Sequence, residues 1–288
     1  MRLPHLEQLL VRLSATDLDA GDEYQLSPPH ERVLGRLAGW AAADGCLPWA
    51  ARRAQKDGID TGDLAWGLLT PTHWHVGTDH MTTLDPQTLA LTAEDSRALM
   101  DSVAPLFVDE GWLIAWGAGT RWYVAHESLT ELPTASLDRV IGRNPDLWMP
   151  DRPGVRTLRR IQSEVQMVLH DHPVNDRREA AGLPAINTVW LSGCGVFQPT
   201  TGEAAAVIDD LRTPLLCEQW DAWLQAWQHI DGTVLKAALA RIRRHESVTL
   251  HLCGERHAQR YESQPQSLWR RITGARPRVT MADALLAL

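Results

Sequence analysis

Apolar residues recur along this chain with two different periods. Spacings of three and four predict helices over residues 96–108, 155–170, 232–244 and 281–288. Short apolar or alternating runs predict strands at 112–116, 121–125, 186–191 and 248–252. Gly117-Ala118-Gly119-Thr120 joins the first two strands and is typical of a hairpin turn. Because helices and strands alternate, we expect an α/β fold, a mixed sheet with flanking helices.

The strand at 186–191 is expected to end in a glycine turn, Ser192-Gly193-Cys194-Gly195. Such a turn would expose backbone N–H groups, which favour an anion. Gln198-Pro199-Thr200-Thr201-Gly202 is the best linker candidate. We therefore expect a main α/β region over 1–198 and a C-terminal α/β region over 199–288, packed on the same body.

Tryptophan dominates the aromatic residues, with 13 Trp against 3 Tyr and 2 Phe. Trp220, Trp223 and Trp227 fall at helical spacing on one stripe with Leu216 and Leu224. The stripe could be a stacking platform for bases or sugars. Its regular spacing favours a buried helix face instead.

The composition excludes several protein classes. Hydrophobic residues make up 44% and charged residues 22%, which is ordinary for a globular protein. No stretch approaches the roughly 18 apolar residues of a membrane span, and Glu7 precedes any apolar run, which argues against a secretory signal. The four cysteines lie far apart without a C-x-x-C pair, as in a protein of the reducing cytoplasm.

Charge is unevenly distributed along the chain, whose formal net charge is −8. Residues 236–288 carry 10 basic and 4 acidic side chains, so this segment is basic on an acidic body. Nucleic acid could bind here, at Arg241, Arg243, Arg244, Arg270 and Arg271. Docking of the segment on its own body is the favoured interpretation, because the whole molecule would repel a polyanion at a distance.

Arginine and asparagine side chains suggest an anion site. Arg139 and Arg143 are four residues apart, on one face of an expected helix, and paired guanidinium groups bind phosphate or carboxylate. The full candidate set is Arg139, Arg143, Asn144, Asn175, Arg178, Asn187, Ser192 and Gly193. The alternative is that these arginines pair with nearby carboxylates, those of Asp138, Asp146, Asp176 and Glu179.

A histidine-rich stretch, residues 72–80, is the most metal-like part of the sequence. His73 and His75 would point to the same face of a strand, and Asp79 or His80 could return across the turn. Such a set would suit zinc or manganese. Twelve histidines make chance clustering easy, so polar surface or hydrogen-bonded core histidines are the competing interpretation.

Two segments resemble known families. His172-Pro173-Val174-Asn175-Asp176-Arg177-Arg178 and the later Gly182 to Gly195 run resemble archaeal-type cofactor-independent phosphoglycerate mutases. The blocks Leu137 to Asn144 and Gln162 to Met167 are similar to a proteobacterial family labelled phosphoglycerate mutase or Rpf-cluster regulatory protein.

The mutase resemblance implies an alkaline-phosphatase-like scaffold with two metal ions and a serine nucleophile. The motif that supplies the metals in those enzymes, of the type Asp-Gly-x-Gly-Asp, does not occur here, where Asp44-Gly45 is followed by Cys-Leu-Pro. Phosphoryl transfer without its metals loses most of its electrostatic stabilisation. We therefore expect a degenerate scaffold in a non-catalytic regulatory or ligand-binding protein, whose partner is an anionic small molecule and which needs no cofactor. A metal-dependent mutase or phosphatase using zinc or manganese is the alternative, and nucleic-acid association is a second one.

Overall fold

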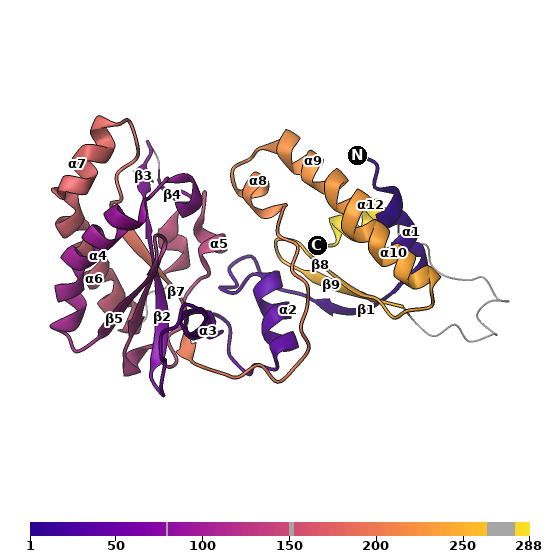
Figure 1. Cartoon of the computed structure of the whole chain (residues 1–288), viewed down its shortest axis with the longest axis horizontal. Helices are drawn as coiled ribbons and strands as arrows, with labels where there is room; N and C mark the ends of the chain where they lie inside the picture. The colour runs from indigo at the N-terminus through magenta and orange to yellow at the C-terminus, as the bar shows by residue number, and fades with distance from the viewer. Residues whose placement is uncertain (79, 150–152, 264–279) are drawn as a thin grey trace. The chain divides into compact units, whose positions relative to one another are not determined.

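A computed structural model of the chain describes residues 1–78, 80–149, 153–263 and 280–288 (Figure 1). The chain forms two compact units. The central unit comprises Tyr24–Pro28 and Gly35–Ala204. The terminal unit comprises Met1–Glu23, Pro29–Leu34 and Ala205–Leu288, so both ends of the chain contribute to it. The boundary expected near residue 198 stays a prediction.

The central unit is built on a four-stranded antiparallel sheet. Its strands are β2 (Ala65–Thr72), β5 (Leu113–Ala118), β6 (Arg121–Ala125) and β7 (Thr188–Val196), in the order β5-β6-β2-β7. Leu68 on β2 pairs with Tyr123 on β6 and with Ser192 on β7. Every residue of β2 is buried, because helices cover both faces of the sheet.

Helices lie on both sides of this sheet (Figure 1). They are α3 (Trp49–Lys56) on one face, and α4 (Ala93–Val108), α6 (Pro153–His170) and α7 (Pro173–Ala180) on the other. Strand side chains alternate between the two cores: Trp122 and Val124 pack with α4 and α6, whereas Tyr123 and Ala125 pack with the alanines of α3. The α/β class with helices flanking a sheet is therefore confirmed, but the sheet expected to be mixed has only antiparallel pairs among its described strands.

Shorter elements complete the central unit. They are the hairpin β3 (Trp74–Val76) and β4 (Met81–Thr83), the helix α5 (Leu137–Val140), and the 3-10 helices η1 (Pro86–Thr88), η2 (Glu127–Leu129) and η3 (Pro145–Trp148). Helix α2 (Pro29–Ala38) begins in the terminal unit and ends in the central one.

The terminal unit combines a three-stranded antiparallel sheet with helices. The strands β1 (Ser14–Asp19), β9 (Ala258–Glu262) and β8 (Thr249–Cys253) lie in the order β1-β9-β8. The helices are α1 (Pro4–Arg12), α8 (Arg212–Leu216), α9 (Trp220–Ile230), a π-helical turn η4 (Asp231–Leu235), α10 (Lys236–Arg243) and α12 (Met281–Leu286). Leucines of α1 share a core with Trp227, Leu239 and Leu252.

The tryptophan stripe lies on α9, and the burial expected for it is only partly right. Trp227 is buried, Trp223 is half-buried and Trp220 is 56% exposed. The helix contacts the core along its second half, so its first turn projects Trp220 into solvent. Among the described residues, no helix is both long and apolar enough to cross a membrane.

Candidate functional site

A pocket lies in the central unit at the β7 edge of the sheet. It is lined by Leu69, Phe107, Trp112, Val124, Pro133, Thr134, Ala135, Trp148, Met149, Leu158, Ile161, Gln162, Val189, Trp190 and Leu191. Three successive residues of β7 belong to this lining, and successive side chains of a strand point to opposite faces. The pocket therefore reaches around the edge of the last strand.

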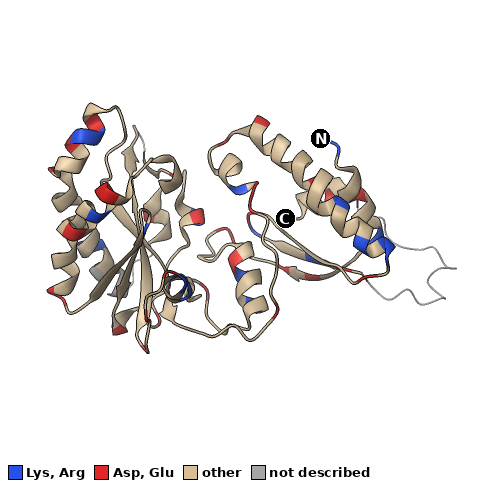
Figure 2. Ribbon diagram, in the orientation of Figure 1, with Lys and Arg blue, Asp and Glu red and all other residues tan. Residues whose placement is uncertain are grey.

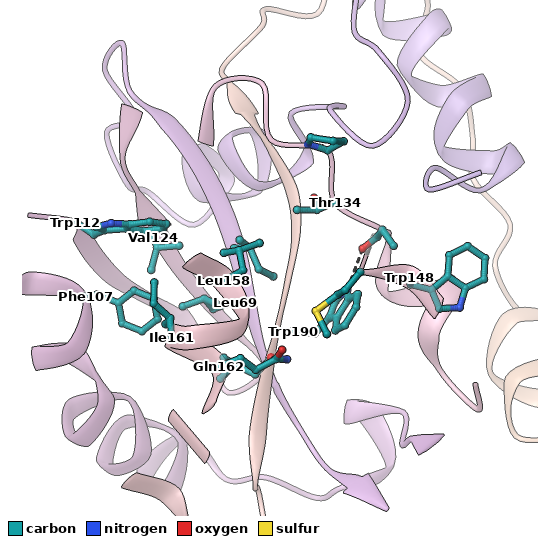
Figure 3. Close-up of a pocket in the computed structure, with 15 residues that line it drawn as sticks. Leu69, Phe107, Trp112, Val124, Thr134, Trp148, Leu158, Ile161, Gln162 and Trp190 are labelled. Atoms are coloured by element: carbon teal, nitrogen blue, oxygen red, sulfur yellow. Dashed lines mark hydrogen bonds between the residues drawn. The ribbon is translucent and has the colours of Figure 1, made fainter. Parts of the chain in front are cut away.

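Aromatic rings form much of the pocket wall. Figure 3 shows Phe107 and Trp112 at one end, Trp148 at the other and Trp190 between them. The Trp190 indole Nε1 donates to the Ala135 carbonyl at 2.9 Å, which fixes that ring. Trp112 stacks on His126 with centroids 5.0 Å apart and planes inclined by 4°. These contacts hold the walls in place before any ligand arrives.

The pocket volume is about 40 Å³. Because one water needs roughly 10–15 Å³ on this measure, the space admits about three heavy atoms. An apolar lining of this size suits a short alkyl group or the edge of a ring. Met149, on the wall, has an adaptable side chain that could enlarge the space.

Two guanidinium groups approach the Trp148 end of the pocket. The Cζ atoms of Arg139 and Arg143 lie 5.7 and 5.9 Å from the centroid of the Trp148 ring. These distances are within the range of a cation–π interaction. Arg139 is 2% exposed, whereas Arg143 is half-buried. Two guanidinium groups therefore lie at one aromatic ring at this end of the pocket.

The single helix face expected for these arginines is wrong. Helix α5 ends at Val140, and Gly142 follows with a left-handed φ of 73°, which ends the helical geometry before Arg143. The Gly142 amide donates to the Thr83 carbonyl, and the Thr83 amide donates to the Arg143 carbonyl. Backbone pairing with β4, rather than helical spacing, therefore brings Arg143 to the same ring as Arg139.

Asn144 has a local structural role. Its side-chain Oδ1 accepts a hydrogen bond from the Asp146 amide at 3.0 Å and so caps η3, the short helix that ends in Trp148. Asn144 therefore helps to place Trp148 without lining the pocket itself.

Two other residues of the candidate anion set, Asn175 and Asn187, bind backbone groups away from the pocket lining. Asn175 donates to the carbonyls of Leu169 and Ile186 and accepts from the Ile186 amide. Asn187 accepts from the Trp74 amide and donates to the Trp74 carbonyl. These bonds fasten the segment before β7 to α6 and β3.

Arg178 is also engaged by the backbone. It donates to the Pro184 carbonyl at 2.9 Å and to the Leu89 carbonyl at 2.5 Å. Burial lowers the pKa of this guanidinium below its ordinary value, and nearby Asp95 acts in the opposite direction. An anion-binding role for Asn175, Arg178 and Asn187 stays a prediction.

The glycine turn expected after residue 191 is wrong. Strand β7 continues through Ser192 and Gly193 to Val196, with a bulge opposite Gly67. Gly193 has φ of 64°, and a Cβ there would lie 3.1 Å from the Ala50 backbone nitrogen. The glycine thus allows helix α3 to approach the sheet closely, and this segment is not an open loop.

The histidine stretch forms the hairpin β3–β4. His73 Nδ1 lies 2.7 Å from the Ala185 carbonyl, and the rings of His73 and His75 are 6.3 Å apart. His75 and His80 are exposed, and Asp79 lies outside the described residues. Within the described ranges, no group of three or more His, Cys, Asp or Glu side chains could hold a metal. Zinc or manganese at this hairpin stays a prediction.

Two nucleophile candidates have unsuitable surroundings. Cys194 is fully buried, and burial raises the pKa of its thiol to about 12. Ser102 Oγ lies 2.9 Å from His172 Nε2, but His172 Nδ1 already accepts from the Val174 amide. The neutral ring must then carry its proton on Nε2, where it donates to Ser102 and cannot act as its base.

The basic C-terminal segment is partly neutralised. Figure 2 shows basic residues at the end of α10. Arg241 and Arg244 both bind Glu246, and Arg243 donates to Gln8. Arg270 and Arg271 lie outside the described residues. Binding of nucleic acid here stays a prediction.

Most residues of the pocket carry no sequence signal that points to a site. Trp112, Trp148 and Thr134 carry no motif, and the strand and loop positions that bring them together are distant in sequence. Gln162 did carry a signal, because it lies four residues after Leu158 and three before Val165, on the apolar face of α6. A glutamine in that stripe could have been identified as a buried polar group.

Comparisons with known proteins give structural similarity alone. No protein-family model and no curated protein matches the sequence. The PH0037 protein from Pyrococcus horikoshii is similar with a TM-score of 0.36 and 15% identity, over 80% of this chain and 53% of that chain. This chain thus spans about half the length of that protein. A cofactor-independent phosphoglycerate mutase from Thermoplasma acidophilum DSM 1728 is similar with a TM-score of 0.38 and 14% identity, over 92% and 82% of the two chains. Both TM-scores are below 0.5, so neither similarity assigns a family or an activity to this chain.

Proposed function

We propose that this chain is a cytoplasmic, non-catalytic regulatory protein that binds a small molecule with a short apolar part and a phosphate or carboxylate group. One observation carries the proposal: Arg139 and Arg143 both approach Trp148, whose ring lines an apolar pocket. The apolar part of the ligand enters the pocket, and its anionic group binds the guanidinium groups at the Trp148 end. The regulatory role rests on the resemblance of residues 137–167 to Rpf-cluster regulatory proteins.

The energetics favour a ligand that has both parts. Burying a propyl group yields about 2 kcal/mol at roughly 0.8 kcal/mol per CH₂. A charge-assisted hydrogen bond adds about 1.5–3 kcal/mol. Neither part alone provides tight binding once the entropy of association is subtracted.

The test uses butyrate and butyl phosphate as anionic probes and butanol as the neutral probe. Binding is followed by the chemical shifts of the tryptophan indole N–H groups in NMR spectra. We expect both anions to shift indole resonances at the pocket and to bind about tenfold more tightly than butanol. Equal binding of butanol, or no binding of any probe, would contradict the proposal.

A pair of arginine variants distinguishes anion binding at the pocket from a general effect of surface charge. Arg143→Gln should reduce the affinity for both anions by about tenfold and leave that for butanol unchanged. Arg52→Gln is the matched control, because Arg52 is also half-buried and lies 5.4 Å from a tryptophan ring, that of Trp40, outside the pocket. A loss of anion binding in both variants would argue against a specific site.

The proposal that the protein has no catalytic activity is tested separately. Purified protein is assayed for conversion of 3-phosphoglycerate to 2-phosphoglycerate, with added manganese and with a chelator. We expect no turnover under either condition. Metal-dependent turnover at an enzyme-like rate would establish the mutase alternative and direct attention to His73 and His75.

A further inference from the structure

Gln162 is a polar residue on the buried face of α6. It is 9% exposed and lies among apolar positions of the same helix, Leu158, Ile161 and Val165. A buried amide is costly unless its hydrogen-bonding groups are satisfied. The partners of its two polar atoms therefore decide whether the residue is purely structural.

Among the described residues, only one of these two atoms has a hydrogen-bond partner. Gln162 Nε2 donates to the Val189 carbonyl at 2.9 Å. Since a carbonyl oxygen can only accept, this bond fixes which end of the amide is nitrogen. Oε1 accepts no hydrogen bond from any residue in the described ranges.

The free oxygen belongs to a residue that lines the pocket. Figure 3 shows the end of the Gln162 side chain beside Trp190. The neighbouring donors are committed elsewhere, because Trp190 Nε1 donates to Ala135 and the Thr134 hydroxyl faces the Gly45 carbonyl at 3.5 Å. Trp148, which also lines the pocket, has a buried Nε1 that makes no hydrogen bond to any described residue, Gln162 included. Since no residue in the described ranges donates to Oε1, its hydrogen-bond donor would be solvent or a ligand.

We infer that Gln162 is a specificity-determining residue, whose Oε1 accepts a hydrogen bond from a hydroxyl or N–H group on the apolar part of the ligand. This inference rests on the proposed function and narrows the ligand to a short-chain acid or phosphate that carries such a donor. Buried polar groups discriminate strongly in this direction, since an analogue without the donor leaves the oxygen desolvated and unpaired.

The test compares butyrate with 2-, 3- and 4-hydroxybutyrate, which place a hydroxyl at each position of the chain. In the wild-type protein, at least one isomer should bind about threefold to tenfold more tightly than butyrate. This comparison needs no substitution and is independent of any effect on folding. If butyrate binds as tightly as every hydroxylated isomer, the inference is overturned.

Two variants assign the preference to Gln162. Gln162→Leu should abolish it, and Gln162→Met, which keeps the unbranched shape, should do the same if the leucine variant fails to fold. Thr134→Val is the matched control, because it removes a different polar group from the same pocket and should retain the preference. A preference that persists in a folded Gln162 variant refutes the role of Gln162 while the proposed function stands. Absence of binding by butyrate and all three isomers overturns both.

Discussion

Asp231 caps helix α1 through the backbone of Leu6, a residue 225 positions away in sequence. Asp231 Oδ1 accepts from the Leu6 amide at 2.8 Å. The His5 amide also donates to this carboxylate, and His5 Nδ1 lies 2.8 Å from Oδ2. Leu3, the residue at the N-cap position, provides no side-chain hydrogen bond. A carboxylate in the π-helical turn after α9 thus replaces the missing local cap.

We expect Asp231→Ala to destabilise the terminal unit by about 1–3 kcal/mol, because it leaves buried amides of α1 without an acceptor. Hydrogen exchange of the α1 amides should accelerate accordingly. Asp221→Ala, at an exposed position of α9, is the control and should change exchange little. Equal protection of α1 in both variants would show that the cap is not stabilising.

Asp57 should make the stability of the central unit depend on pH. Arg121 donates two hydrogen bonds to its carboxylate, Tyr123 donates another, and the Arg121 bond is the main reason that the pKa of Asp57 is lowered from 3.8. Because the pKa is lower in the folded state, the unfolded chain binds the proton first as the pH falls. The stabilisation is therefore complete well above pH 4 and is lost below it, as pH falls through the folded-state pKa.

Replacement of this carboxylate should remove that dependence. Asp57→Asn should cost about 2 kcal/mol at pH 7, and its difference from the wild type should shrink below about pH 4. Urea unfolding at pH 7 and pH 3 measures this. Asp63→Asn, at an exposed position, should follow the wild type at both values. A constant difference between Asp57→Asn and the wild type would exclude Asp57 as the titrating group.

Cys194 should be unreactive in the native protein. Its thiol is fully buried, and its pKa of about 12 leaves almost no thiolate at pH 8. Iodoacetamide should modify exposed Cys253 first and Cys194 only after denaturation, as read by peptide mass spectrometry. Rapid native labelling of Cys194 would show that the sheet opens at β7.

Gly193 and Gly182 allow backbone strain to be separated from packing. Both have left-handed φ values, 64° and 70°, but a Cβ would meet nothing within 4 Å at Gly182 and would crowd α3 at Gly193. Each alanine substitution should cost about 1 kcal/mol for its φ. Gly193→Ala should cost about 1–3 kcal/mol more through overpacking, as measured by urea unfolding. Equal losses of unfolding free energy in the two variants would mean that α3 shifts to accommodate the added methyl group without loss of stability.

The sequence was most informative where one element has a regular pattern. The helix expected over 155–170 is observed as Pro153–His170, and the hairpin expected from 112 to 125 is observed as β5 and β6. In both cases the apolar period reports a local face that packs on the core. Strand β1 carries no such pattern, because none of its residues is buried and it joins the sheet through backbone pairing with β9.

The candidate site was only partly predictable. Arg139 and Arg143 were identified as a pair, but their common partner Trp148 follows from the pairing of residues 142–143 with β4, which no helical period reveals. Asn175 and Asn187 were chosen for their polarity. Their amides instead satisfy backbone groups around the 182–187 segment, a use that composition does not distinguish from ligand binding.

The terminal unit is built from both ends of the chain, and this has a consequence for folding during synthesis. A nascent chain emerges from the ribosome N-terminus first, so the leucines of α1 appear long before Trp227 and Leu239, which cover them. The central unit, almost continuous in sequence, can fold in the interval. Until Asp231 has been translated, the α1 segment has no cap for its first turn, and its apolar face stays exposed. A ribosome stalled before that codon would therefore hold a folded central unit preceded by a segment that chaperones recognise.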